Sequence, residues 1–158
     1  MTIQFLKTNA KNEDFIKLVA QLDTDLATRD GADHSFYHQF NGIDRLEHCL
    51  VAYYNHKAVG CGALKTFDPT TLEVKRMYVL PDFRGKGIAT KVLTALEVWT
   101  KALGFHHCLL ETGKRQPEAI ALYQKNGYVI VPNYPPYEGV QNSLCFRKTV
   151  HGQTNKNS

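Results

Sequence analysis

The chain has 158 residues, of which 43% are hydrophobic and 22% are charged, and its formal net charge is +4. This length and composition predict one folded domain, over residues 1–150, and exclude a disordered chain and a collagen-like repeat. No apolar run approaches the roughly 20 residues of a membrane span, and the N-terminus lacks the features of a signal peptide. A cytoplasmic protein is therefore expected, with residues 151–158 as a disordered tail.

The positive charge is unevenly distributed along the chain. Residues 11–47 hold four basic and eight acidic side chains, whereas residues 48–158 hold fourteen basic and seven acidic ones. Apart from one short cluster, the basic residues are scattered, which disfavours a nucleic acid as partner. The split instead predicts two ligands of different charge, one anionic and one cationic.

The predicted elements of the first half are four strands, one helix, and a segment that is either a loop or a short helix. A strand is predicted at 3–6, and Asn12 is suited to cap a helix that ends near residues 30–31. Residues 32–46 have weak periodicity, typical of a loop or a short helix. Three strands with short turns follow at 49–54, 58–67 and 72–80, and these are expected to form an antiparallel meander.

In the second half, strands and helices alternate. Ile88, Val92, Leu96 and Trp99 define one face of a long helix that ends at Gly104. The remaining predicted elements are a strand at 107–110, a helix from Pro117 to Asn126, and strands at 128–131 and 143–148. The order predicts a mixed α/β sheet, antiparallel at first and with parallel pairing at the strand–helix–strand crossover.

The four cysteines lie inside apolar, strand-like runs and match no metal-binding spacing: Cys49, Cys61, Cys108 and Cys145. Reduced, buried thiols are expected, and a catalytic cysteine is disfavoured because no basic cluster or lone histidine stands beside any of them. No metal is expected, since the histidines likewise lack partners at ligand spacing.

The most informative stretch is residues 79–89, where a strand leads through a basic glycine loop into a helix. Gly85 and Gly87 allow the backbone to approach a ligand, and Arg84 and Lys86 add positive charge. Such a loop directs several N–H groups at one point, which favours a phosphate or pyrophosphate. The spacing fits neither the GxxxxGK loop nor the GxGxxG loop. A solvated turn is the alternative.

Residues 84–89 resemble the R/Q-x-x-G-x-G/A signature of the GNAT superfamily of acetyl-CoA-dependent N-acetyltransferases. The resemblance extends to residues 73–79, 111–113 and 119–128, in the family's order. It implies the GNAT fold and acetyl-CoA as co-substrate. Many members have an asparagine shortly before the last of these segments, where this chain has Gln116, and Gln116 is the candidate to replace it as a CoA contact.

The resemblance also implies roles for residues along the cofactor side. The backbone of Met77, Tyr78 and Val79 would bind the pantetheine arm, with the Val79 N–H as oxyanion donor. The pyrophosphate would be held by a loop and the first helical turn, namely Arg84, Gly85, Lys86, Gly87, Ile88, Ala89 and Thr90.

Two side chains are candidates for proton transfer. Glu73 lies six residues before Val79, so both face one side of the strand if no bulge intervenes, and Glu73 is the candidate base. An ion pair with Lys65 or Lys75, or a water chain as base, is the alternative. Tyr123 is the candidate acid for the leaving thiolate, and core packing is its alternative role.

Two aromatic segments are candidates for the acceptor site, because the resemblance implies that these regions vary with substrate. They contribute Phe36, Tyr37 and His38, and Tyr134 and Tyr137. Aromatic faces can hold a cation, although these rings could equally cover the core.

The sequence therefore predicts direct acetyl transfer to a primary amine, most simply that of a small molecule. No nucleic-acid or membrane partner is expected, and a homodimer is compatible with the sequence. A protein or peptide amine as acceptor is one alternative. A non-catalytic acyl-CoA-binding module is the other, and it would keep the loop without needing Glu73 or Tyr123.

Overall fold

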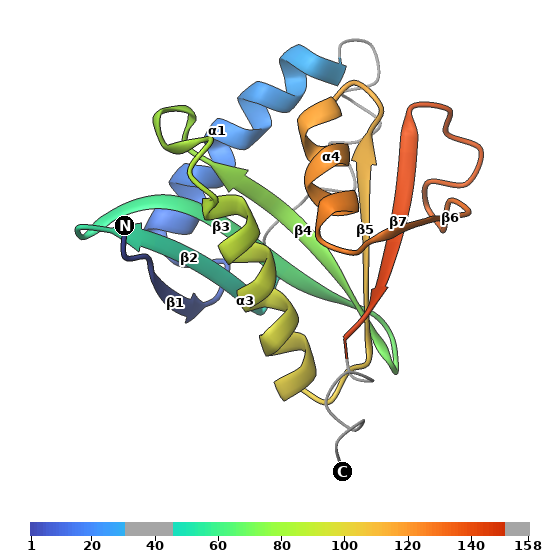
Figure 1. The fold of residues 1–158 in the computed structure, drawn as a ribbon, viewed down its shortest axis with the longest axis horizontal. Helices are drawn as coiled ribbons and strands as arrows, with labels where there is room; N and C mark the ends of the chain where they lie inside the picture. Colours follow the sequence, from blue (N-terminus) through green and yellow to red (C-terminus); the bar gives the residue numbers. More distant parts are fainter. Residues whose placement is uncertain (31–45, 151–158) are drawn as a thin grey trace. The chain divides into compact units, whose positions relative to one another are not determined.

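The computed structural model describes residues 1–30 and 46–150 (Figure 1). It divides into two compact units. The first unit is Met1–Lys65 with Val74–Leu96, and the second is Thr66–Glu73 with Glu97–Ser158. The segment expected to be a loop or short helix lies mostly outside the described residues, as does the expected tail. Within the described ranges, no helix is long and apolar enough to cross a membrane.

The described strands form a mixed seven-stranded sheet in the order β1-β2-β3-β4-β5-β7-β6. Their bounds are Gln4–Thr8 (β1), His48–Tyr54 (β2), Lys57–Asp68 (β3), Thr71–Val79 (β4), His107–Gly113 (β5), Val129–Val131 (β6) and Ser143–Thr149 (β7). β2 pairs with β1 and β3 in the antiparallel sense, whereas β4 and β5 are parallel over Thr71–Glu73 and His107–Leu109. The expected mixed sheet with parallel pairing at the crossover is confirmed.

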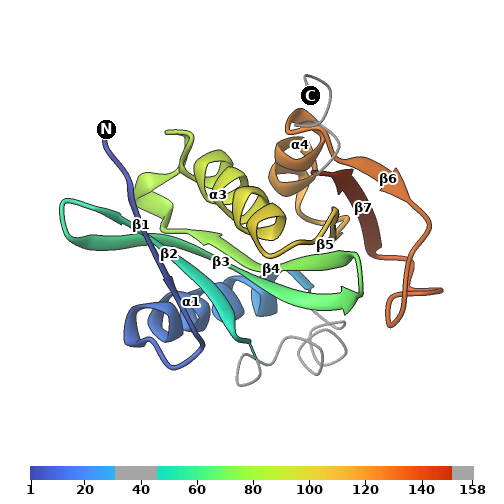
Figure 2. The same ribbon diagram turned by 90° about the horizontal axis from the view of Figure 1, so that it is seen from below.

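In the first unit, α1 (Glu13–Asp30) lies on one face of the sheet and the start of α3 (Ile88–Ala102) on the other (Figure 2). Asn12 caps α1 as predicted, because its Oδ1 accepts a hydrogen bond from the Phe15 N–H at 2.9 Å. On the opposite face, a Cβ placed at Gly62 would stand only 2.7 Å from Leu96 Cδ1. The glycine therefore lets α3 pack directly on the strand.

In the second unit, α4 (Pro117–Lys125) packs on β7, with the ring of Tyr123 5.9 Å from that of Phe146. The end of α3 is tied to the same unit by Glu97, which accepts hydrogen bonds from Tyr128 and Lys148, both at 2.9 Å. β5 is longer than the predicted 107–110 because it pairs with β7 as far as Gly113.

Candidate functional site

A strand, a glycine loop and a helix follow one another in the first unit. β4 ends at Val79, a 3-10 turn (η2) covers Pro81–Phe83, and α3 begins at Ile88. Gly85 and Gly87 have φ values of 77° and 80°, a conformation that favours glycine. Beyond the two adjacent residues, no atom lies within 4 Å of where a Cβ would stand on either glycine.

The first turn of α3 follows the loop directly. The Lys91 N–H donates to the Gly87 carbonyl at 3.1 Å, which starts the intrahelical ladder, so the N–H groups of Ile88, Ala89 and Thr90 precede it. The positive end of the helix dipole lies at the same place, and Lys86 is exposed beside it. This arrangement fits a phosphate or pyrophosphate group.

Arg84 fixes the loop against the strand that precedes it. Its Nε–H donates to the Val79 carbonyl at 2.9 Å, and its guanidinium lies 5.3 Å from the centroid of the Tyr78 ring. From the sequence, Arg84 was expected only to supply positive charge to a bound anion. The structure adds that part of the guanidinium is used to hold the loop in place.

The backbone of β4 is irregular at Arg76, which has φ 59° in the middle of the strand. A left-handed residue interrupts the alternation of side chains, as a β-bulge does. Beyond it, Met77 lies beside Gly62 on the α3 face, and Tyr78 belongs to the α1 core. Because this irregularity separates Glu73 from Val79, their even spacing no longer argues that they share a face.

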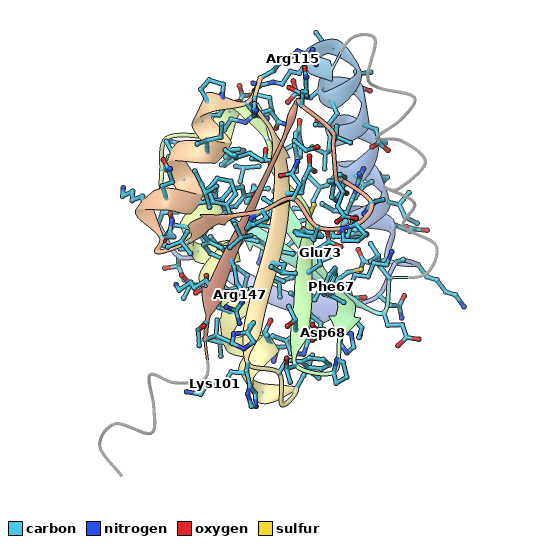
Figure 3. All side chains as sticks on the ribbon, turned by 90° about the vertical axis from the view of Figure 1, so that its right-hand side faces the viewer. Phe67, Asp68, Glu73, Lys101, Arg115 and Arg147 are labelled. Atoms are coloured by element: carbon cyan, nitrogen blue, oxygen red, sulfur yellow. The ribbon has the colours of Figure 1, made fainter. Side chains whose placement is uncertain are left out.

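Glu73, which is labelled in Figure 3, lies in the second unit and is 8% exposed. Its carboxylate accepts a hydrogen bond of 2.8 Å from the Tyr134 hydroxyl. The rings of Phe67 and Tyr137 lie 5.2 and 5.7 Å from that of Tyr134. Burial, followed by the charge of Glu73, raises the pKa of Tyr134, so its hydroxyl remains a donor at physiological pH. A carboxylate is therefore held among aromatic rings at this point.

Glu111 is a second carboxylate in this region, and the sequence reasoning did not single it out. It lies on β5 two residues after Leu109, the partner of Glu73, so both acids face the same side of the sheet. Its Oε2 atom is buried. The detectable signal was an acid at the end of the apolar run 107–110.

Tyr123 lies on α4, is 6% exposed and packs 5.9 Å from the rings of both Tyr128 and Phe146. Burial raises its pKa, and the charge of Glu111 adds to the effect. The phenol is thus protonated at physiological pH and is a proton donor rather than a base. Its packing also fits the alternative role in the core.

The remaining predicted site residues differ in how much the structure describes. Gln116 stands immediately before α4 and makes no capping hydrogen bond with its side chain. Tyr134 and Tyr137 are only 8% and 2% exposed, which agrees with rings that cover a core. Phe36, Tyr37 and His38 lie outside the described residues.

Residues 10–128 match the model of the acetyltransferase (GNAT) family, which is about three quarters of the chain. The chain belongs to the GNAT family of acetyltransferases. The strand, glycine loop and helix described above are the segment that carries the resemblance in sequence.

Individual proteins agree with the family assignment. The chain is 40% identical to the IAA acetyltransferase of Azospirillum brasilense over 102 residues, 64% of this chain and 67% of that protein. A Klebsiella pneumoniae structure assigned as an acyl-CoA N-acyltransferase superposes with a TM-score of 0.80 at 28% identity, covering 94% and 98% of the two chains. A GNAT acetyltransferase of Elizabethkingia anophelis with acetyl-CoA bound shares the fold, with a TM-score of 0.66, 21% identity and 93% and 97% coverage.

The cysteines offer no alternative nucleophile for a GNAT protein of this kind. All four are buried and unpaired by disulfides. Burial raises the pKa of Cys49 and Cys61 to about 12, and of Cys108 and Cys145 to about 11, so the thiols are neutral at physiological pH. Among the described residues, no group of His, Cys, Asp or Glu side chains is placed to hold a metal ion.

Proposed function

We propose that the protein transfers the acetyl group of acetyl-CoA directly to a primary amine of a small molecule. The observation that carries the proposal is the glycine loop between β4 and α3, in a chain that matches the GNAT family model. The loop combines left-handed glycines, unfilled space at both of them and first-turn N–H groups, which is what a bound pyrophosphate requires.

On the donor side, the residues from Arg84 to Thr90 would hold the pyrophosphate. The backbone of Met77, Tyr78 and Val79 would pair with the pantetheine arm, as an added strand does. The Val79 N–H is the proposed donor to the carbonyl oxygen as negative charge develops on it. The contact of Arg84 with the Val79 carbonyl supports this role, because it restrains that residue where the strand meets the loop.

Acetyl-CoA supplies an activated thioester, and the protein's side chains manage the protons. An alkyl ammonium has a pKa of about 10, so the acceptor must lose a proton before its nitrogen can attack. Glu73 is the proposed base, and its buried carboxylate would also attract the ammonium form. As the C–N bond forms and the C–S bond breaks, Tyr123 would donate a proton to the departing sulfur.

The acceptor is proposed to be a cationic small molecule. Glu73 and Glu111 face one side of the second unit, and Phe67, Tyr134 and Tyr137 supply aromatic surface around Glu73. Carboxylates with aromatic rings are suited to an ammonium group. Phe36, Tyr37, His38 and Gln116 are retained as proposed acceptor and CoA contacts. The name of the Azospirillum relative also favours a small acceptor over a protein.

The test is release of coenzyme A from acetyl-CoA in the presence of small amines, amino acids and N-terminal or lysine peptides. Turnover that is highest with a small primary amine supports the proposal. Turnover only with peptides would make the protein a peptide acetyltransferase. Tight CoA binding without turnover on any acceptor would indicate a non-catalytic acyl-CoA-binding module.

Substitutions then test the assigned roles. Glu73→Gln and Tyr123→Phe are each expected to lower kcat by about 10²–10⁴-fold, the usual contribution of general acid–base catalysis, while CoA affinity is retained. Glu111→Gln is the comparison, because it distinguishes which carboxylate accepts the proton. An unchanged kcat in Glu73→Gln would remove Glu73 from the mechanism.

A further inference from the structure

Arg76 adopts a backbone conformation that its residue type disfavours. It has φ 59° within β4, and a side chain with a Cβ in the left-handed region meets the neighbouring carbonyl. Asn55 and His56 also have positive φ, but they form the turn between β2 and β3, where such values are ordinary. Among the described non-glycine residues, only Arg76 has a positive φ inside a strand.

Both the side chain and the carbonyl of Arg76 are held by neighbours. Its guanidinium pairs with the carboxylate of Asp23 on α1, and the arginine side chain is only 2% exposed. The Cys61 thiol on β3 donates to the Arg76 carbonyl at 3.3 Å. The ion pair to α1 and the hydrogen bond from β3 together restrain both the side chain and the backbone of Arg76.

This restrained residue directly precedes the backbone assigned to the pantetheine arm. Met77, Tyr78 and Val79 follow it without interruption, and their side chains are already fixed, with Met77 against Gly62 and Tyr78 in the α1 core. A change of φ at Arg76 would rotate the peptides that come after it. The conformation of Arg76 therefore determines where the N–H and C=O groups of the next three residues point.

We propose that Arg76 and Asp23 are positioning residues, and that their ion pair holds β4 in the irregular conformation that aims the Met77–Val79 backbone at the pantetheine arm. The inference rests on the proposed function only for the identity of the ligand. Helix α1 would then contribute to CoA binding through Arg76, without touching the cofactor.

The alternative is that Arg76 contributes only charge or packing. The two explanations differ in what glycine does at this position, because glycine adopts a left-handed φ without a steric penalty. Arg76→Gly removes the ion pair and keeps the conformation accessible. Arg76→Ala removes the ion pair and leaves a Cβ that favours the extended conformation. Asp23 is 35% exposed, so neither variant leaves it as a buried, unpaired charge.

The experiment compares these two variants for CoA affinity by calorimetry and for amide hydrogen exchange of residues 77–79 without ligand. Arg76→Gly is expected to bind CoA about twofold more weakly than the wild type, because glycine without the ion pair adopts left-handed and extended φ values about equally. Arg76→Ala should bind about 5- to 30-fold more weakly than Arg76→Gly, the population ratio that a left-handed non-glycine residue implies, and should exchange faster. Lys75→Gly and Lys75→Ala are the matched pair, because Lys75 is in the same strand without a positive φ. At Lys75 the order of CoA affinities should reverse, because glycine is the less favourable residue in an extended strand.

Equal CoA affinity and equal exchange in Arg76→Gly and Arg76→Ala would overturn the inference, as would weaker binding by the glycine variant. If neither variant folds, Asp23→Asn decides, since unchanged affinity and exchange there would show that the ion pair positions nothing. A wild-type protein that binds no CoA would contradict the proposed function, while the exchange comparison would still test the role of Arg76.

Discussion

At Glu73, a buried carboxylate receives its hydrogen bond from Tyr134, a residue 61 positions further along the chain. The pair matters for function because a base must be held in one orientation to accept a proton efficiently. It matters for stability because a buried carboxylate that loses a donor retains its desolvation penalty. The Tyr134 hydroxyl is therefore expected to influence both.

Tyr134→Phe removes only the hydroxyl that donates to Glu73, and so tests both expected effects. The variant should lower kcat and destabilise the fold by about 1–3 kcal/mol, measured by steady-state kinetics and denaturant unfolding. Tyr53→Phe is the matched control, since the Tyr53 hydroxyl donates to Asp14 at 2.7 Å in the first unit, among residues with no proposed catalytic role. A similar loss of stability in both variants, with kcat lowered only in Tyr134→Phe, would agree with the assignment. Equal kcat in the two would show that Tyr134 serves the fold alone.

Among the structural elements, the loop between β4 and α3 depends on glycine conformation rather than on space. A Cβ at Gly87 would meet no atom within 4 Å, so the effect of an alanine there comes from its φ of 80°. Gly104, just after α3, shares both properties, with φ 89° and no neighbour within 4 Å. These two glycines separate the effect of strain from the effect of position.

Gly87→Ala should destabilise the protein by about 1–2 kcal/mol and weaken CoA binding, because the peptide must rotate to relieve the side chain. Gly104→Ala should lose similar stability and bind CoA normally. Thermal unfolding and calorimetry measure the two quantities. If the two variants lost CoA affinity equally, the loop would have no special part in binding.

The elements were predictable where local patterns determine them. The apolar spacing of Ile88, Val92 and Leu96 and the capping side chain of Asn12 both correctly located helices. The left-handed Arg76 was not predictable, because no glycine marks it and its conformation depends on contacts with α1 and β3. For the same reason the sequence could not show that Tyr134 reaches Glu73, since this contact depends on the packing of distant segments.

For the whole molecule, the uneven charge along the sequence predicted ligands of opposite sign. The basic part of the chain, residues 48–158, contains the loop proposed for the phosphates, whereas the acidic part, residues 11–47, contains α1. In the structure, however, the carboxylates proposed to face the amine are Glu73 and Glu111, which belong to the basic part. Local placement, rather than the charge of a segment, is what the acceptor would recognise.

Ligand binding should stabilise the whole molecule by mass action. At a CoA concentration about 100 times Kd, the expected gain is about 2.7 kcal/mol, which raises Tm by about 5–10 °C for a chain of this size. Thermal unfolding with and without CoA measures the shift, and Gly87→Ala should shift less at the same concentration. The absence of any shift at saturating CoA would contradict binding to the folded state.

The four buried, neutral cysteines have a practical consequence for enzymology. A disulfide reagent reacts with thiolates, and coenzyme A exposes its thiol fully to water once it is released. The thiols of the folded protein are shielded and held in the unreactive form. The colour that such a reagent develops during turnover would therefore report the product, with little background from the enzyme, and any rise in that background would signal unfolding.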